Sequence, residues 1–133
     1  MANKGSILAT NKVLGVHDYL ASKSGLFFAI MQPDGNFCVY RGSDPDNNYG
    51  LLWCTKKTAR GGQFFAIMQT DGNFVIYKGK PGGKRAHVWS HKKTAPGGEF
   101  YATIQDDGNF CVYKGKRPEE NRGRPVWCSK VID

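Results

Sequence analysis

Three copies of one nine-residue motif constrain this chain more than any other feature. Each copy reads Gln-x-Asp-Gly-Asn-Phe-x-(Val/Ile)-Tyr, and the copies run from Gln32 to Tyr40, from Gln69 to Tyr77 and from Gln105 to Tyr113. Even spacing of this kind indicates one structural unit that is used three times. The sequence therefore predicts a single domain over residues 1–133, built from three repeats at about 20–56, 57–93 and 94–130.

The segments around each motif predict an all-β fold. An apolar stretch precedes each motif, and a Trp follows it, as the sequence shows at Phe27–Met31, Phe64–Met68, Phe100–Ile104, Trp53, Trp89 and Trp127. Asp-Gly between apolar runs is a strong hairpin signal, and we expect a primed turn because Gly accepts positive φ. No segment has the 3.6-residue apolar period of a helix. The N-terminal stretch 7–20 is expected to add strands that complete the first unit and close the last.

Strand alternation divides each motif between two faces. Phe37 and Val39 share one face, while Asn36, Cys38 and Tyr40 share the other. The apolar face belongs to the core, where the three Trp side chains are also expected to pack. The other face is polar and remains available for a ligand.

The polar set is difficult to explain by turn formation alone. Turn chemistry accounts for Asp and Asn, but not for an unvarying Gln before them and a Tyr after them. Carboxylate, amide and phenol groups together offer both donors and acceptors, as the neighbouring hydroxyls of a sugar require. We therefore predict carbohydrate-binding sites at Gln32, Asp34, Asn36, Cys38, Tyr40, Gln69, Asp71, Asn73, Val75, Tyr77, Gln105, Asp107, Asn109, Cys111 and Tyr113.

The middle motif resembles a known signature. Residues 69–77 match in full the Gln-x-Asp-x-Asn-x-Val-x-Tyr pattern of the bulb-type (monocot) mannose-binding lectins, and similar lectins occur in fish skin mucus, fungi and bacteria. The resemblance extends from about Leu8 to the C-terminus. It implies a β-prism II fold, with three four-stranded antiparallel sheets around a pseudo-threefold axis.

The resemblance also implies a function. It predicts calcium-independent binding of α-D-mannose, with Gln69, Asp71, Asn73 and Tyr77 hydrogen-bonding the sugar and Val75 packing on its apolar edge. Members of this family commonly dimerise by exchanging C-terminal strands, so 131–133 is a candidate segment for a homodimer and agglutinin.

Two units depart from the signature at the Val position. Cys38 and Cys111 stand there, and the same two units carry Cys54 and Cys128 after their Trp, whereas the middle unit has Val75 and Ser90. This pairing predicts cross-strand neighbours, either as disulfides or as packed thiols. The cysteine position of the family's usual bridge holds Gly35, Gly72 and Gly108, so that bridge is absent. The middle site is expected to bind best.

Charge suggests an alternative function. The formal net charge of +8 would suit a basic module that binds anionic glycans or other polyanions, with partly degenerate mannose sites. No RNA-binding motif is visible, so nucleic acid is not an expected partner. Each motif offers one Asp rather than the facing pair that glycoside hydrolysis uses, and His87 and His91 lack further zinc ligands. We therefore expect no enzyme activity, metal or cofactor.

The remaining expectations concern location. No apolar run approaches the roughly 18 residues of a membrane span, so membrane insertion is not expected. The start of the sequence, 1–5, lacks an apolar signal region. We expect a protein that is cytoplasmic or secreted by a non-classical route, with mannose-containing glycans and glycoproteins as partners.

Overall fold

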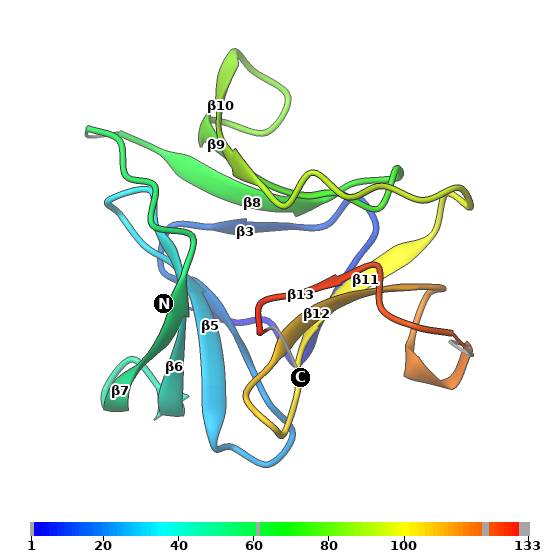
Figure 1. Cartoon of the computed structure of the whole chain (residues 1–133). Helices are drawn as coiled ribbons and strands as arrows, with labels where there is room; N and C mark the ends of the chain where they lie inside the picture. Colours follow the sequence, from blue (N-terminus) through cyan, green and yellow to red (C-terminus); the bar gives the residue numbers. More distant parts are fainter. Residues whose placement is uncertain (1, 61, 121–122, 131–133) are drawn as a thin grey trace.

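Three β-sheets form the sides of a prism in the computed structural model of this chain (Figure 1). The structure describes residues 2–60, 62–120 and 123–130. The first sheet contains, in spatial order, β1 (Ala2–Asn3), β4 (Asp18–Ala21), β5 (Phe27–Met31), β6 (Phe37–Asp44) and β7 (Asn47–Cys54). The second contains β10 (Arg85–Ser90), β9 (Phe74–Gly79), β8 (Phe64–Met68) and β3 (Val13–Gly15), and the third β13 (Trp127–Cys128), β12 (Phe110–Lys114), β11 (Phe100–Ile104) and β2 (Ile7–Ala9).

The predicted β-prism II fold is confirmed, with one addition. All strand pairs are antiparallel except that of the short β1, which runs parallel to β4 and gives the first sheet a fifth strand. A 3-10 turn, η1 (Pro118–Glu120), is the only helical element within the described residues. None of the described residues form a helix that is long and apolar enough to cross a membrane.

The N-terminal segment contributes to every sheet, with two strands in the first and one in each of the others. β4 pairs with β5 in the first sheet, β3 with β8 in the second and β2 with β11 in the third. We expected N-terminal strands in the first and last units only, but the middle sheet also contains one. The candidate exchange segment at 131–133 lies outside the described residues.

The motif turns differ from the predicted primed turns. In the first unit, Gly35 N donates to Gln32 O at 3.1 Å and Gln32 N donates to Asn36 O at 3.0 Å, and the other two units repeat both bonds. The hairpin loop thus has three residues, and only its last residue, Gly35, adopts positive φ, at 87°. A primed two-residue turn would also require positive φ at Asp34, whereas this loop is a type I turn closed by a left-handed Gly.

These glycines also allow each unit to touch the next. A Cβ on Gly35 would lie 2.9 Å from the ring of Phe64, and one on Gly72 would lie 3.1 Å from Phe100. Gly108 approaches Phe27 in the same way, which closes the circle. Each motif turn therefore packs against the first strand of the neighbouring unit.

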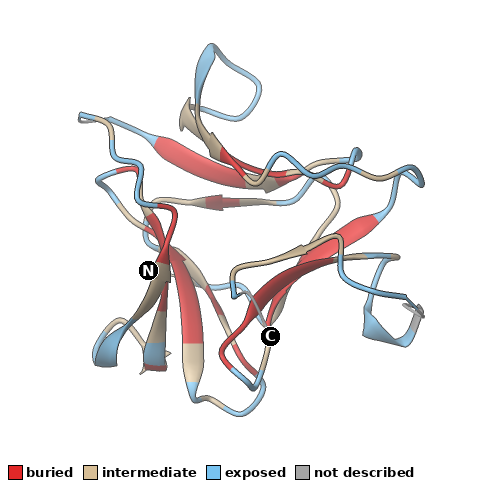
Figure 2. Cartoon of the chain, viewed as in Figure 1, coloured by how far each residue is buried: buried red, intermediate tan, exposed pale blue. Residues whose placement is uncertain are grey.

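Aromatic side chains fill the axis of the prism. Phe37, Phe74 and Phe110 are fully buried, and their ring centroids lie 5.0 to 5.1 Å apart in a closed triangle. The three Trp side chains form a second triangle with centroids 5.5 to 5.7 Å apart, packed against the core but only half-buried. Figure 2 shows the buried segments concentrated on the central strands of each sheet. The motif Phe is thus the residue that joins the three sheets.

Candidate carbohydrate-binding sites

Each motif places its Asp and Asn side chains at the hairpin loop, where one oxygen of each side chain already accepts a backbone N–H. Asp71 Oδ1 accepts the backbone N–H of Asn73 at 3.0 Å, and the corresponding bonds in the other units measure 3.0 and 2.9 Å. Within the described part of the chain, the second carboxylate oxygen of each Asp has no hydrogen-bond partner. Each site therefore presents one fixed, free acceptor.

The Asn side chains are oriented by the segment that follows the Trp-containing strand. Asn36 Oδ1 accepts the N–H of Lys56 at 2.9 Å, Asn73 Oδ1 that of Lys92 at 3.2 Å, and Asn109 Oδ1 that of Lys130 at 2.9 Å. Because the carbonyl end is held by the protein, the amide NH₂ must point away as a donor. Among the described residues, nothing accepts a hydrogen bond from the amide NH₂ of Asn36 or Asn73.

Gln and Tyr form a pair on the adjacent strands of each hairpin. Gln69 Nε2 donates to Tyr77 Oη at 2.8 Å, while Tyr40 and Tyr113 donate to Gln32 Oε1 and Gln105 Oε1 at 2.5 and 3.1 Å. Burial and the nearby Asp34 raise the pKa of Tyr40, and burial and Asp107 raise that of Tyr113. Tyr40 and Tyr113 are therefore neutral hydrogen-bonding groups at physiological pH.

The Val position of the signature lies beneath this polar set. Val75, Cys38 and Cys111 are only 2%, 1% and 1% exposed. Any contact that Val75 makes with a ligand is therefore limited to a small part of its surface.

Two disulfides distinguish the outer units from the middle one. Cys38 is bonded to Cys54 and Cys111 to Cys128, each directly across the strand pair. Val75 faces Ser90 at the corresponding place. Cys38, Cys54 and Cys111 are buried and Cys128 is partly buried, so the bridges stand where the middle unit has its Val–Ser pair.

One set of site residues was missed by the sequence interpretation. Thr55 Oγ1 accepts the N–H of Phe37 and donates to Asn36 Oδ1, at 3.1 and 2.8 Å. Ser129 Oγ does the same for Phe110 and Asn109, at 3.1 and 3.2 Å. A hydrogen-bonding residue stands two positions after each Trp, and this recurrence is the signal that could have identified the set.

In the middle unit, the residue two positions after the Trp is His91. Its Nε2 accepts the N–H of Phe74 at 3.0 Å, and its ring stacks on Trp127 with centroids 4.8 Å apart and an interplanar angle of 10°. Burial lowers the pKa of His91 to about 4. A hydrogen bond with the Gly72 backbone and the negative charge of Asp71 partly oppose this lowering. His91 is therefore a neutral structural support for the middle site.

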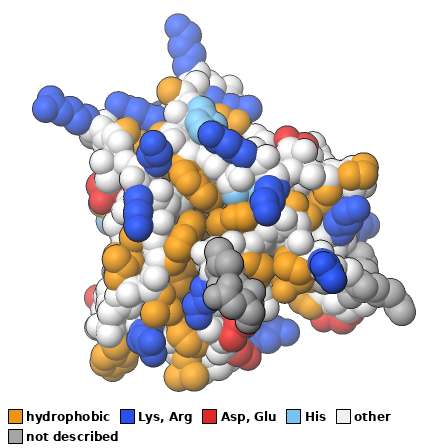
Figure 3. All heavy atoms as spheres, viewed as in Figure 1, with side chains coloured by type: hydrophobic (Ala, Val, Ile, Leu, Met, Phe, Trp, Pro, Cys, Tyr) orange, Lys and Arg blue, Asp and Glu red, His pale blue; other side chains and the backbone are white. Residues whose placement is uncertain are grey.

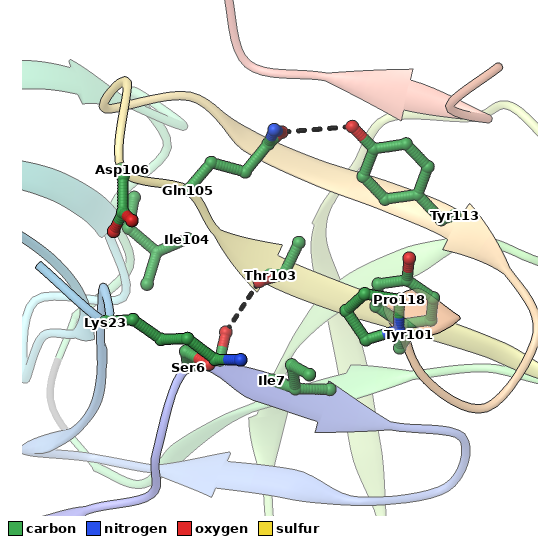
Figure 4. Close-up of a pocket in the computed structure, with 10 residues that line it drawn as sticks. All are labelled: Ser6, Ile7, Lys23, Tyr101, Thr103, Ile104, Gln105, Asp106, Tyr113 and Pro118. Carbon is green, nitrogen blue, oxygen red and sulfur yellow. Dashed lines mark hydrogen bonds between the residues drawn. The ribbon is translucent and has the colours of Figure 1, made fainter. Parts of the chain in front are cut away.

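The third site differs from the others in access and in its surroundings. Asn109 is 1% exposed, and Lys130 Nζ donates to Asp107 O at 3.0 Å beside it. A cavity of about 360 Å³ adjoins Gln105 and Tyr113, and Figure 4 shows Lys23, Ser6 and Thr103 on its opposite side. Thr103, which donates to Ser6 O at 2.8 Å, occupies the place of Ile30 and Ile67 in the other units. The three sites are thus related but not equivalent.

The described residues contain no group of three or more His, Cys, Asp or Glu side chains that could hold a metal ion. The motif groups are hydrogen-bonding groups held in place by the backbone.

Comparison with solved structures identifies the fold. The Japanese Marasmius oreades lectin superimposes with a TM-score of 0.71 at 28% identity, covering 96% of this chain and 93% of that one. A monomeric monocot mannose-binding lectin from Gastrodia elata gives 0.69 at 28% identity, with 93% and 96% covered. The mannose-specific snowdrop (Galanthus nivalis) agglutinin, solved with methyl-α-D-mannoside, gives 0.67 at 28% identity, with 89% and 99% covered.

The fold of this chain is that of the bulb-type mannose-binding lectins. This result confirms the resemblance that the middle motif carries. These neighbours are lectins, carbohydrate-binding proteins without enzyme activity, in agreement with the prediction that the chain is not an enzyme. The sequence matches no protein-family model and no curated protein.

Proposed function

We propose that this protein is a calcium-independent lectin that recognises α-D-mannose and mannose-rich glycans through its motif sites. The observation that carries the proposal is the pairing, at the first and middle hairpin loops, of a free carboxylate oxygen with an amide NH₂ directed by the backbone. Vicinal hydroxyls of a sugar need an acceptor and a donor at neighbouring positions. The mannose-specific names of the snowdrop and Gastrodia neighbours support this choice of sugar.

The middle site is proposed to bind most strongly. It retains Val75, and Asn73 is more accessible than the buried Asn109 of the third site. Each sugar hydrogen bond replaces one to water, so the net gain is about 1 kcal/mol or less per bond. Single-site affinity is therefore weak, and several sites on one rigid prism, or in a homodimer, would raise avidity.

The test uses Asn→Asp substitutions, because they retain the oxygen that accepts the backbone N–H and replace the amide donor with a charged acceptor. Asn73→Asp should weaken binding of methyl α-D-mannoside by about tenfold or more, measured by calorimetry in EDTA, because the sugar hydroxyl loses its donor and faces a second carboxylate beside Asp71. Asn36→Asp and Asn109→Asp are matched controls with smaller expected losses. Wild-type binding by Asn73→Asp would contradict the proposal, and equal losses in all three would contradict the ranking.

The disulfides favour an oxidising environment for this lectin. We infer that it acts outside the reducing cytosol. Thiol titration of the protein purified from its native source should find no free cysteine if the inference holds.

A further inference from the structure

The positive charge of the chain is concentrated in the unit that has the complete signature. Residues 57–93 contain eight Lys or Arg and one acidic residue, Asp71, so their formal charge is +7 out of +8 for the chain. Residues 20–56 contain three basic and three acidic residues, and 94–130 contain six and five. The basic residues of the middle unit are Lys57, Arg60, Lys78, Lys80, Lys84, Arg85, Lys92 and Lys93.

Lys78 and Arg85 lie in the strands of the second sheet, and Lys80 and Lys84 lie in the loop between β9 and β10. Figure 3 shows Lys and Arg side chains over the upper part of the view, where β8, β9 and β10 lie, with few acidic side chains among them. An anion that approaches this sheet would therefore meet a positive potential that the other two sheets lack.

One of these cations adjoins the mannose motif directly. The guanidinium of Arg85 lies over the ring of Tyr77, 4.5 Å from its centroid, and the hydroxyl of the same ring accepts from Gln69. His87 faces Tyr77 across the strand pair, with ring centroids 6.3 Å apart. Arg85 is exposed and forms no ion pair with any described residue, so its N–H groups are available to a ligand.

The first unit offers an internal comparison. Arg85 faces Gly79 in the second sheet, and the residue that faces the corresponding Gly42 in the first sheet is the neutral Asn48. The first site therefore lacks the cation that adjoins the middle site.

We propose that the middle site takes mannose that carries an anionic group, a phosphate ester or a carboxylate, and that Arg85 binds the anion. Guanidinium matches both groups with paired N–H donors, and stacking on Tyr77 holds it in place beside the sugar. This inference rests on the proposed function, because the sugar ring is to be held by Gln69, Asp71, Asn73 and Tyr77. It adds the chemical class of glycan for which the middle site is selective.

Calorimetry with the full chain at low salt tests the proposal. The probes are methyl α-D-mannoside, mannose 6-phosphate, mannuronic acid and inorganic phosphate, and the variants are Arg85→Gln and Arg41→Gln. The wild type should bind at least one acidic sugar about three- to tenfold more tightly than the neutral mannoside. Arg85→Gln should remove this preference and leave the neutral mannoside within about twofold of wild type. Arg41→Gln removes the same charge from the first sheet and should retain the preference.

The acidic probes distinguish the source of the anion, since mannose 6-phosphate tests a phosphate ester and mannuronic acid a carboxylate. Absence of any preference in the wild type, or a preference that survives in Arg85→Gln, would overturn the inference. Binding of inorganic phosphate as tight as that of the acidic sugars would also overturn it, because mannose would then contribute nothing. Failure of the proposed function is a separate result, in which neither the neutral mannoside nor any acidic sugar binds.

Discussion

The stability of the middle sheet should depend on pH through His91. In the folded protein, burial lowers the pKa of this ring to about 4, from an ordinary value of 6.5. Between these two values the unfolded chain binds a proton that the folded chain does not. Linkage then requires the free energy of unfolding to fall as the pH decreases from about 6.5 towards 4, and to be fully retained above 6.5.

The structure gives both the cause and the magnitude of this effect. Backbone N–H groups of Phe74 and Lys93 lie 3.0 Å from Nε2 and Nδ1, so a doubly protonated ring would face donors on both sides. At about pH 4.5 the full shift corresponds to about 2.5 kcal/mol. Because the ring is partly exposed and solvent screens its charge, we expect about 1 kcal/mol.

Urea unfolding with the disulfides intact, at about pH 7 and about pH 4.5, measures the loss. His91→Thr is the appropriate variant, because Thr55 occupies this place in the first unit and makes the corresponding bonds. Between the two pH values, the free energy of unfolding of the wild type should fall by about 1 kcal/mol more than that of His91→Thr. The carboxylates contribute equally to both proteins. His87→Gln removes an exposed histidine from the same sheet and should keep the wild-type difference. Equal losses in the wild type and His91→Thr would refute the reasoning.

Two further predictions concern stability. Gly35→Ala should lower the free energy of unfolding in urea by about 1 kcal/mol more than Gly82→Ala does. Both positions have positive φ, but only a Cβ at 35 would crowd Phe64. Equal losses would show that the contact between units does not stabilise the protein. Cys38→Val with Cys54→Ser recreates the Val75–Ser90 pair and should cost at most about 3 kcal/mol, the value expected for a loop of this length. A larger loss would mean that the Val–Ser pair does not fit the first sheet.

Much of this architecture could be predicted from repetition within the sequence. The alternation in the motif identified Phe37 and Val39 as core residues, and both are fully buried. The paired occurrence of cysteines indicated that Cys38 lies beside Cys54, as the strand register shows. These inferences succeeded because side-chain direction in a strand depends only on local alternation.

Other features depend on contacts that local patterns do not encode. Asp-Gly is compatible with both a primed turn and a three-residue loop, and in the three-residue loop observed here Gly35 packs on the Phe64 ring of the next unit. The role of His91 depends on Trp127, which belongs to another sheet. The burial of Asn109 likewise follows from the third unit's own surroundings, and its motif gives no sign of it.

The contacts between units explain why the sites belong to the whole prism. Gly35 packs on Phe64, Gly72 on Phe100 and Gly108 on Phe27, so each binding loop rests on the next unit around the axis. The buried triangle of Phe37, Phe74 and Phe110 joins the same three hairpins from inside. A unit excised from the chain would lose both supports and one N-terminal strand, and its Asp and Asn would no longer be held for a ligand. The three motif loops are therefore held together by the way the core closes, and the units can diverge only at positions outside these contacts, such as Arg85.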